Sequence, residues 1–142
     1  MKNKIIICHI PYQDNENDNK TSKDDNKKRW LIVYSENEKY IYCYNITTLT
    51  ESKSHNLRDN TLIIKRKDNI KLLKSDSIVK LNKIYRIEKF NGIEKYFLSN
   101  IEEISKKDMT NIIRKTKLIK NNSSQKEVQI SKGKFMLLNE NN

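Results

Sequence analysis

A dense cationic segment runs directly into an apolar strand pattern at residues 27–35, which read KKRWLIVYS. Its cations either end a solvated loop or start a rigid strand that aims a guanidinium at an anion. A guanidinium is always charged and can grip two phosphate oxygens at once, so Arg29 is a candidate anion-binding residue. Trp30 follows it, either as a core side chain or as a flat face on which an unpaired base could stack.

The charge balance favours a polyanionic partner. The 142 residues carry 29 Lys plus Arg against 18 Asp plus Glu, which gives a formal net charge of +11. Such a balance favours nucleic acid first and an acidic protein second. The chain is also rich in Lys, Asn and Ile together, a bias that genome composition alone can produce. Charge therefore supports nucleic-acid binding without establishing it.

Several other chemistries are disfavoured by the sequence. Cys8 and Cys43 each lie within an apolar strand pattern typical of core thiols, and no Cys-x-x-Cys or His-x-x-x-His spacing exists. We therefore expect neither a metal nor a cofactor. His9 lies in an apolar strand and His55 in a polar loop, so we place neither in the catalytic set. No apolar run suits a membrane span or a signal peptide, which leads us to expect a cytoplasmic protein.

Period-two alternation predicts five strands, and a change of period predicts one later helix. The strands are expected at residues 3–10, 29–35, 39–49, 61–66 and, long or bent, 76–90, with polar loops at 13–28 and 50–60. Ser105 and Asp108 resemble a capping box at the helix start. After them Met109, Ile112 and Thr116 recur at helical spacing, which extends the helix to about residue 119.

These elements predict a mainly β fold with a C-terminal helix, of the α+β class. Strands in sequence with short links favour an antiparallel, strongly coiled sheet, most economically a small barrel. Residues 1–120 form the predicted domain. Residues 121–142 are a predicted C-terminal extension, either a hairpin around Lys132 and Gly133 or a tail ordered by a partner.

The order of these segments resembles the MazF/PemK family, the ribonuclease toxins of bacterial toxin–antitoxin pairs. Four stretches carry the resemblance in the family's order over roughly residues 3–120: IPYQD, KKRWLIVYS, CYNITT and LLKSDSIVKLNKIYRIEK. Trp30 departs from the family's usual proline, and the loop before it is longer than is typical. The resemblance implies a small SH3-like barrel of the MazF/CcdB/Kid type.

The resemblance also implies a metal-independent endoribonuclease that cleaves single-stranded RNA through attack of the 2′-hydroxyl on the adjacent phosphate. Arg29 then matches the family's catalytic arginine, and Thr47 matches its active-site threonine. Thr48 would face the other side of the strand, and which of the two threonines faces the site stays open. The expected substrate-binding residues are Lys28, Trp30, Thr48, Asp14 and Ser77.

The resemblance implies partners as well. The expected active form is a homodimer with an RNA groove across its interface, neutralised by an acidic antitoxin protein. The alternative is a non-catalytic protein on the same barrel, which binds nucleic acid or inhibits a protein target as the related CcdB fold does with gyrase. A phage-borne inhibitor of a host nuclease would be another such non-catalytic protein. A pure binder does not need Arg29 and Thr47 to converge on one phosphate.

Overall fold

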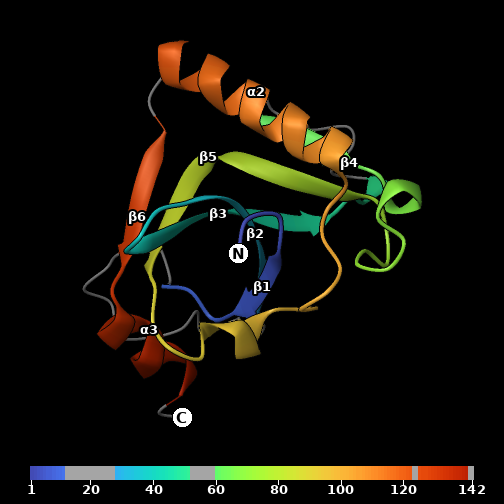
Figure 1. The fold of residues 1–142 in the computed structure, drawn as a ribbon. Coiled ribbons are helices and arrows are strands. Elements are labelled where there is room, and N and C mark those ends of the chain that lie inside the picture. Colours follow the sequence, from blue (N-terminus) through green and yellow to red (C-terminus); the bar gives the residue numbers. More distant parts are fainter. Residues whose placement is uncertain (12–27, 52–59, 123–124, 141–142) are drawn as a thin grey trace.

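The fold is of the mixed α+β class, and the described residues form one six-stranded, mostly antiparallel sheet and two α-helices. The computed structural model describes residues 1–11, 28–51, 60–122 and 125–140. Its elements are β1 (Ile5–Cys8), β2 (Arg29–Glu36), β3 (Tyr40–Thr48), β4 (Thr61–Ile64), η2 (Arg66–Asp68), β5 (Ser77–Glu88), η3 (Ile93–Tyr96), α2 (Lys106–Asn122), β6 (Lys126–Ile130) and α3 (Lys132–Asn139). Figure 1 shows α2 running along one side of the bent sheet and α3 lying well away from it. No helix in these ranges is long and apolar enough to cross a bilayer.

Strand β5 organises the sheet. Antiparallel pairing runs in the order β1-β2-β3-β5-β4, and β6 pairs with β5 in parallel. The first part of β5, residues 77–80, lies between β3 and β4, whereas residues 83–87 lie between β3 and β6. A parallel neighbour requires a crossover connection. The chain from β5 to β6 makes that crossover through α2.

The sheet is open, where the sequence led us to expect a closed SH3-like barrel. Among the described strands, no pairing joins β1 to β4 or to β6. The outer edge of β1 meets irregular chain instead, through one bridge between Ile6 and Phe97 and a 2.8 Å hydrogen bond from Leu98 N–H to the Ile5 carbonyl. Closure fails because the four-residue β1 is covered by residues 97–98 before it reaches another strand edge.

Residues 126–139 form a strand and a helix, where the sequence had left open a hairpin or a tail ordered by a partner. Ser131 caps α3, since its Oγ accepts a hydrogen bond from Lys134 N–H at 3.1 Å. The apolar side chains of the segment, Val128, Ile130, Phe135 and Leu138, are all buried. The C-terminal segment therefore contributes to the same core as the strands that precede it.

Both faces of the sheet are buried, which explains why apolar residues occupy consecutive strand positions. One face packs Ile5, Ile32, Tyr44 and Val79 against Met109, Ile112 and Ile119 of α2. The opposite face packs Ile6, Cys8, Leu31, Cys43 and Tyr85 against Val128 and Phe135. Both cysteines are buried free thiols, as the apolar strand patterns around them predicted.

The N-terminus of α2 lies at the predicted cap, with one additional partner. Ser105 Oγ accepts a hydrogen bond from Asp108 N–H at 3.2 Å and donates to Asp108 Oδ2 at 2.9 Å. Ser105 N–H donates to Asn69 Oδ1 at 2.7 Å, and Asn69 Nδ2 donates to the same Asp108 carboxylate at 2.7 Å. Asn69 and Asp108 are both buried. The connection between β4 and β5 is therefore fixed to the start of the helix.

A buried polar network links α2 to the sheet. Tyr44 Oη lies 2.8 Å from Thr116 Oγ1 and accepts a hydrogen bond from Gln125 Nε2 at 2.9 Å. Thr116 Oγ1 donates to the Ile112 carbonyl at 2.8 Å, so the Tyr44 hydroxyl is the donor in their shared contact. The Tyr44 ring stacks on Tyr34 with centroids 4.5 Å apart. Tyr44 therefore packs in the core and does not offer its ring to a ligand.

Tyr44→Phe is expected to destabilise the fold by about 1–3 kcal/mol, because it removes the two hydrogen bonds that the Tyr44 hydroxyl makes with Thr116 and Gln125 inside the protein. Tyr42→Phe is the matched control: the Tyr42 hydroxyl accepts only an exposed hydrogen bond from Asn37 at 3.2 Å. It should cost less than about 0.5 kcal/mol. Urea denaturation of both variants measures the difference, and equal losses would contradict a structural role for the Tyr44 network.

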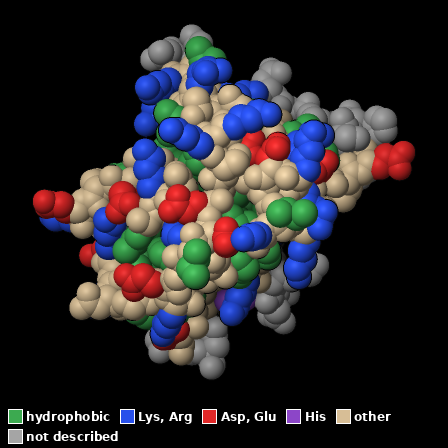
Figure 2. Space-filling model, turned by 45° about the vertical axis from the view of Figure 1, so that its right-hand side comes forward, with side chains coloured by type: hydrophobic (Ala, Val, Ile, Leu, Met, Phe, Trp, Pro, Cys, Tyr) green, Lys and Arg blue, Asp and Glu red, His purple; other side chains and the backbone are tan. Residues whose placement is uncertain are grey.

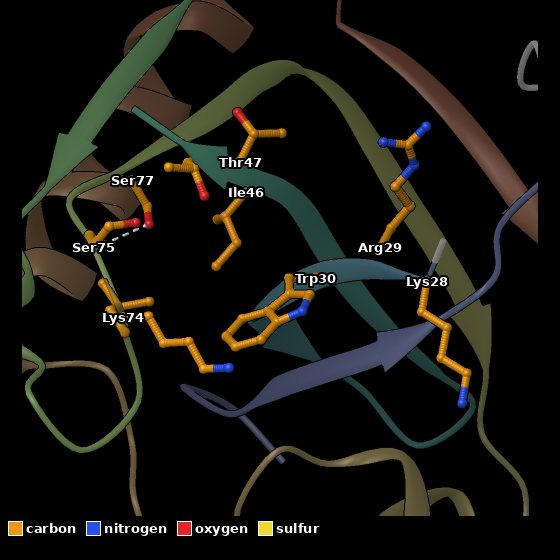
Figure 3. Close-up of a pocket in the computed structure, with 10 residues that line it drawn as sticks. Lys28, Arg29, Trp30, Ile46, Thr47, Lys74, Ser75 and Ser77 are labelled. Atoms are coloured by element: carbon orange, nitrogen blue, oxygen red, sulfur yellow. Dashed lines mark hydrogen bonds between the residues drawn. The ribbon is translucent and has the colours of Figure 1, made fainter. Parts of the chain in front are cut away.

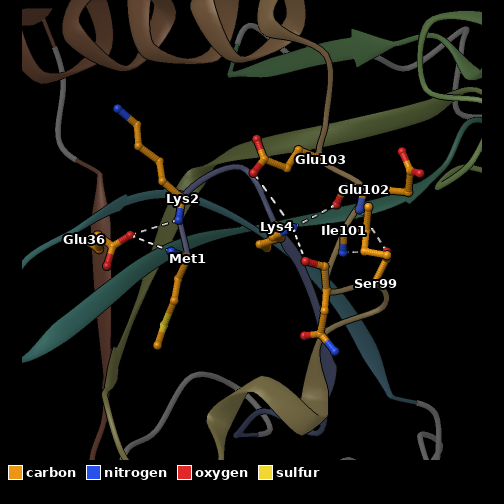
Figure 4. Close-up of polar contacts among 9 residues, drawn as sticks. Met1, Lys2, Lys4, Glu36, Ser99, Ile101, Glu102 and Glu103 are labelled. Carbon is orange, nitrogen blue, oxygen red and sulfur yellow. Dashed lines mark hydrogen bonds and ion pairs between the residues drawn. The ribbon is translucent and has the colours of Figure 1, made fainter.

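The start of the chain is anchored by Glu36 at the end of β2 (Figure 4). The Met1 amino group and Lys2 N–H donate to Glu36 Oε2 at 2.8 and 3.0 Å. Lys89 Nζ donates to Glu36 Oε1 at 2.7 Å. The Lys89 contact, followed by that of the Met1 amino group, lowers the pKa of Glu36 from 4.5 to about 2. The carboxylate therefore joins β1, β2 and the end of β5.

A lowered pKa in the folded state means that ionised Glu36 stabilises the protein at pH values above 4.5, and that this contribution is lost as the pH falls towards 2. Glu36→Gln should reduce the free energy of unfolding by about 1 kcal/mol at pH 7, because partly exposed pairs are screened. The difference between wild type and variant should shrink steadily below pH 4.5. Urea denaturation at a series of pH values tests this, and a difference independent of pH would contradict it.

Candidate functional site

Arg29 and Thr47 project from the same face of the sheet on neighbouring strands. Trp30 of β2 lies opposite Ile46 of β3, and the same register sets Arg29 beside Thr47. Residues that lie opposite each other in a pair of strands share a face. In Figure 3 the Arg29 and Thr47 side chains leave one side of the sheet, and those of Trp30 and Ile46 leave the other. Thr47, and not Thr48, is therefore the threonine that shares a face with Arg29.

The Thr47 hydroxyl is a buried polar group that has no partner among the described residues. Within them, Thr47 Oγ1 is shielded from solvent and makes no hydrogen bond, and the same is true of Asn45 Oδ1 two residues earlier on that face. An unsatisfied buried polar atom costs about 1–3 kcal/mol. Such a group in a native structure requires an explanation, and a role in binding or catalysis is one. Arg29, Asn45 and Thr47 thus place three polar groups on one face at the end of β3.

A half-open cavity of about 270 Å³ lies at the same ends of β2 and β3, and Arg29 and Thr47 both border it. Its apolar part is made by Trp30, Ile46 and Leu73, which pack against the core under α2. Its polar part is made by Lys28, Arg29, Thr47, Thr48, Lys74, Ser75 and Ser77. An aromatic and aliphatic surface edged by cations and hydroxyls suits a ligand with a planar ring and a phosphate.

The wall of the cavity formed by residues 74–77 is held by backbone contacts. Asp76 Oδ1 accepts a hydrogen bond from Arg66 N–H at 2.8 Å, and the Asp76 carbonyl accepts from Leu49 N–H at 2.9 Å. The contact with Arg66 is the largest cause of the lowered pKa of Asp76. Ser77 Oγ donates to the Ser75 carbonyl at 3.1 Å (Figure 3). Asp76 therefore fixes the turn, and Lys74 and Ser75 are presented to the cavity.

Most of the site residues predicted from the sequence border this one cavity: Lys28, Arg29, Trp30, Thr47, Thr48 and Ser77. Asp14 and His55 lie outside the described residues. The His9 backbone is tied to Asn139 by hydrogen bonds of 2.7 and 3.1 Å, and burial, with a smaller effect from Lys28, lowers the pKa of its imidazole.

Three residues at the site were missed by sequence reasoning: Asn45, Lys74 and Ser75. Asn45 carried a usable signal, because it places a polar side chain on the otherwise apolar face of YIYCYNITT. Lys74 and Ser75 carried none beyond their position just before the Asp-Ser pair. Only the pairing of β5 with β3, which sets Ser77 opposite Thr48, brings that segment to the cavity.

The described lining residues supply cations and hydroxyl groups, and no carboxylate or imidazole. Such a set can bind a phosphate and stabilise negative charge that develops on it. It offers no side chain among the described ones that would accept a proton near neutral pH. Across the described ranges, no group of three or more His, Cys, Asp and Glu side chains is placed to hold a metal ion.

Comparison with known proteins gives no family assignment. No protein-family model matches the chain. No curated protein matches it either. The resemblance to the MazF/PemK family therefore stays a prediction from motifs, and the functional argument rests on the geometry of the cavity.

Thr47→Val is expected to stabilise the protein by about 1 kcal/mol, because it removes an unpaired buried oxygen at almost constant volume. Thr116→Val is the matched control: the Thr116 hydroxyl is buried and bonded to both Ile112 and Tyr44. It should destabilise by about 1–3 kcal/mol. Thermal and urea denaturation compare the two, and a clear loss of stability in Thr47→Val would show that the hydroxyl has a structural partner.

Proposed function

We propose that the protein is a metal-independent endoribonuclease of the MazF/PemK kind that cleaves single-stranded RNA. The observation that supports this is the placement of Arg29 and Thr47 on one face of two paired strands, with the Thr47 hydroxyl lacking a partner. A phosphodiester between them would meet a positive charge and a hydrogen-bond donor. The proposal needs no closed barrel, because neighbouring strands of an open sheet supply both groups.

In the proposed reaction, the ribose 2′-hydroxyl attacks the adjacent phosphorus and the bond to the 5′-oxygen breaks. The products are a 2′,3′-cyclic phosphate and a free 5′-hydroxyl. Arg29 offsets the charge on the five-coordinate phosphorus, and Thr47 donates a hydrogen bond to one of its oxygens. The proton of the attacking hydroxyl passes to water or to a phosphate oxygen, and water protonates the leaving oxygen. Lys28 and Lys74 attract the strand electrostatically.

Trp30, Thr48 and Ser77 would hold the nucleotide next to the scissile phosphate. All three line the cavity, and the strand register puts Thr48 and Ser77 on the face of the sheet from which Trp30 projects. The RNA strand would therefore pass around the end of β2. Stacking of a base on an aromatic ring is worth about 1–3 kcal/mol. The proposal further includes a homodimer, an acidic antitoxin protein that competes with RNA for the basic surface, and a cytoplasmic location.

A second candidate is a protein of similar fold that binds nucleic acid, or inhibits a protein target, without catalysis. It is favoured by the lack of a carboxylate or imidazole among the described residues that line the cavity. General acid–base catalysis usually needs a group that titrates near the working pH. The same cations and hydroxyls would then hold a phosphate in place without cleaving its ester bond.

The nuclease proposal predicts cleavage of a long single-stranded RNA in the presence of EDTA. Arg29→Ala should lower kcat/KM by at least about 100-fold, because the charge on the transition state loses its fixed counterpart. Thr47→Val should lower it by about 10-fold or more, while leaving the fold at least as stable. Gel analysis of the products and detection of cyclic phosphate ends measure both effects.

Arg66→Ala is the control for Arg29→Ala, because Arg66 is an exposed arginine that does not line the cavity. It should retain activity within about 3-fold of wild type. RNA that stays intact with wild-type protein under all conditions, together with tight and salt-dependent binding, would reject the nuclease and leave the second candidate. Equal losses in Arg29→Ala and Arg66→Ala would reject the assignment of Arg29.

A further inference from the structure

We propose that the outer face of α2 is a second RNA-binding surface, which contacts the phosphate backbone without reading its sequence. The helix has 17 residues, of which six are Lys or Arg and one is acidic. This leaves a net +5 on α2 out of the +11 of the whole chain. Five of its cations are exposed: Lys106, Lys107, Arg114, Lys117 and Lys120. Figure 2 shows cationic side chains gathered over the upper part of the molecule, where α2 lies in Figure 1.

These five cations have no counter-charge within the described residues. The ion pairs of the protein join other cations, such as Lys89 to Glu36, Lys95 to Glu140 and Arg86 to Glu127. The one acid of α2, Asp108, is buried and held in the helix cap. Lys115, the sixth cation of the helix, donates to the Thr61 carbonyl at 2.8 Å. The exposed strip is therefore uncompensated positive charge.

The stability of the helix does not explain this arrangement. Lys106 and Lys107 occupy the first turn, where the helix dipole disfavours cations. Arg114, Lys117 and Lys120 follow one another at three-residue spacing, and each like-charged pair costs a few tenths of a kcal/mol. The helix is held instead by its buried residues, which include Met109, Ile112 and Ile119. A polyanion bound along the strip would turn this repulsion into attraction.

The chemistry of the strip selects a nucleic-acid backbone as its occupant. From Lys107 to Lys120 it extends for about 20 Å at 1.5 Å per residue, enough for several successive phosphates. The helix contains no aromatic residue, so it cannot stack on bases and would not select a sequence. Its apolar side is buried against the sheet and is not available for insertion into a lipid surface.

This inference goes beyond the proposed function, because backbone binding at α2 does not require cleavage at Arg29. The test uses the full chain carrying Arg29→Ala, so that the RNA stays intact whichever candidate function holds. The probe is a labelled single-stranded oligouridylate of about 20 nucleotides, and fluorescence anisotropy over a range of salt concentrations gives its affinity. A separate cleavage assay with wild-type protein reports on the proposed function.

Lys107→Gln, Arg114→Gln and Lys117→Gln are combined in that background. Their matched control combines Lys2→Gln, Lys39→Gln and Lys132→Gln, three exposed lysines on other elements. The helix variant should bind at least about 10-fold more weakly, and its log–log salt slope should fall by about 2, since each lost phosphate contact removes about 0.7. The control variant, with the same net charge, should bind within about 3-fold of its parent.

Equal losses in the two triple variants would overturn the proposal, because net charge alone would then account for binding. Unchanged binding in the helix variant would overturn it as well. If α2 bound polyglutamate more tightly than the oligouridylate, its partner would be an acidic protein and not RNA. The helix variant should also melt at the same temperature as its parent or higher, since like-charge repulsion has been removed.

Discussion

The register of β2 against β3 is the constraint on which the site depends. Trp30 opposite Ile46 sets the face of every neighbouring side chain. A slip of one residue would move Arg29 and Thr47 to opposite faces, and would bring polar groups into the core under α2. Both faces of the sheet pack against other parts of the core, so a slip would disrupt the packing of both hydrophobic clusters.

The long strand β5 explains how a short chain buries both faces. It pairs with β3 along its length, with an irregularity near Cys43 and Asn45 where the strands bend. That bend divides its other edge between β4 and β6. Helix α2 covers one face on the way from β5 to β6, and α3 follows β6 onto the other. The cavity lies where β2 begins and β3 ends.

The sequence predicted those features that depend on local pattern. Alternation placed the first five strands within two residues of their observed ends, and the Ser105–Asp108 cap marked the start of α2. The motifs that resemble the MazF/PemK family also selected Arg29, Trp30, Thr47 and Ser77, and all four line one cavity. The features that were not predicted depend on contacts between residues far apart in the sequence. The parallel pairing of β6 with β5 joins residues some 40 positions apart, and Asn69 enters the cap of α2 from a loop that has no pattern.

The two basic regions of the protein differ in what fixes their side chains, and this difference suits the two roles proposed for them. Arg29 stands at the start of a paired strand beside Thr47, so the sheet sets the direction of its side chain. A group that stabilises charge at one phosphorus atom must be held in a fixed direction in this way. The five exposed cations of α2 have long flexible side chains and make no ion pair with the described residues. The helix that carries them is held against the sheet by Met109, Ile112 and Ile119. Such side chains cannot position a reacting bond. They can follow the phosphates of a strand that varies in sequence and shape, because a mobile ammonium tolerates many geometries. The proposed cleavage of RNA would need both kinds of group: a cation held in one direction at the reacting phosphate, and mobile cations that attract the rest of the strand.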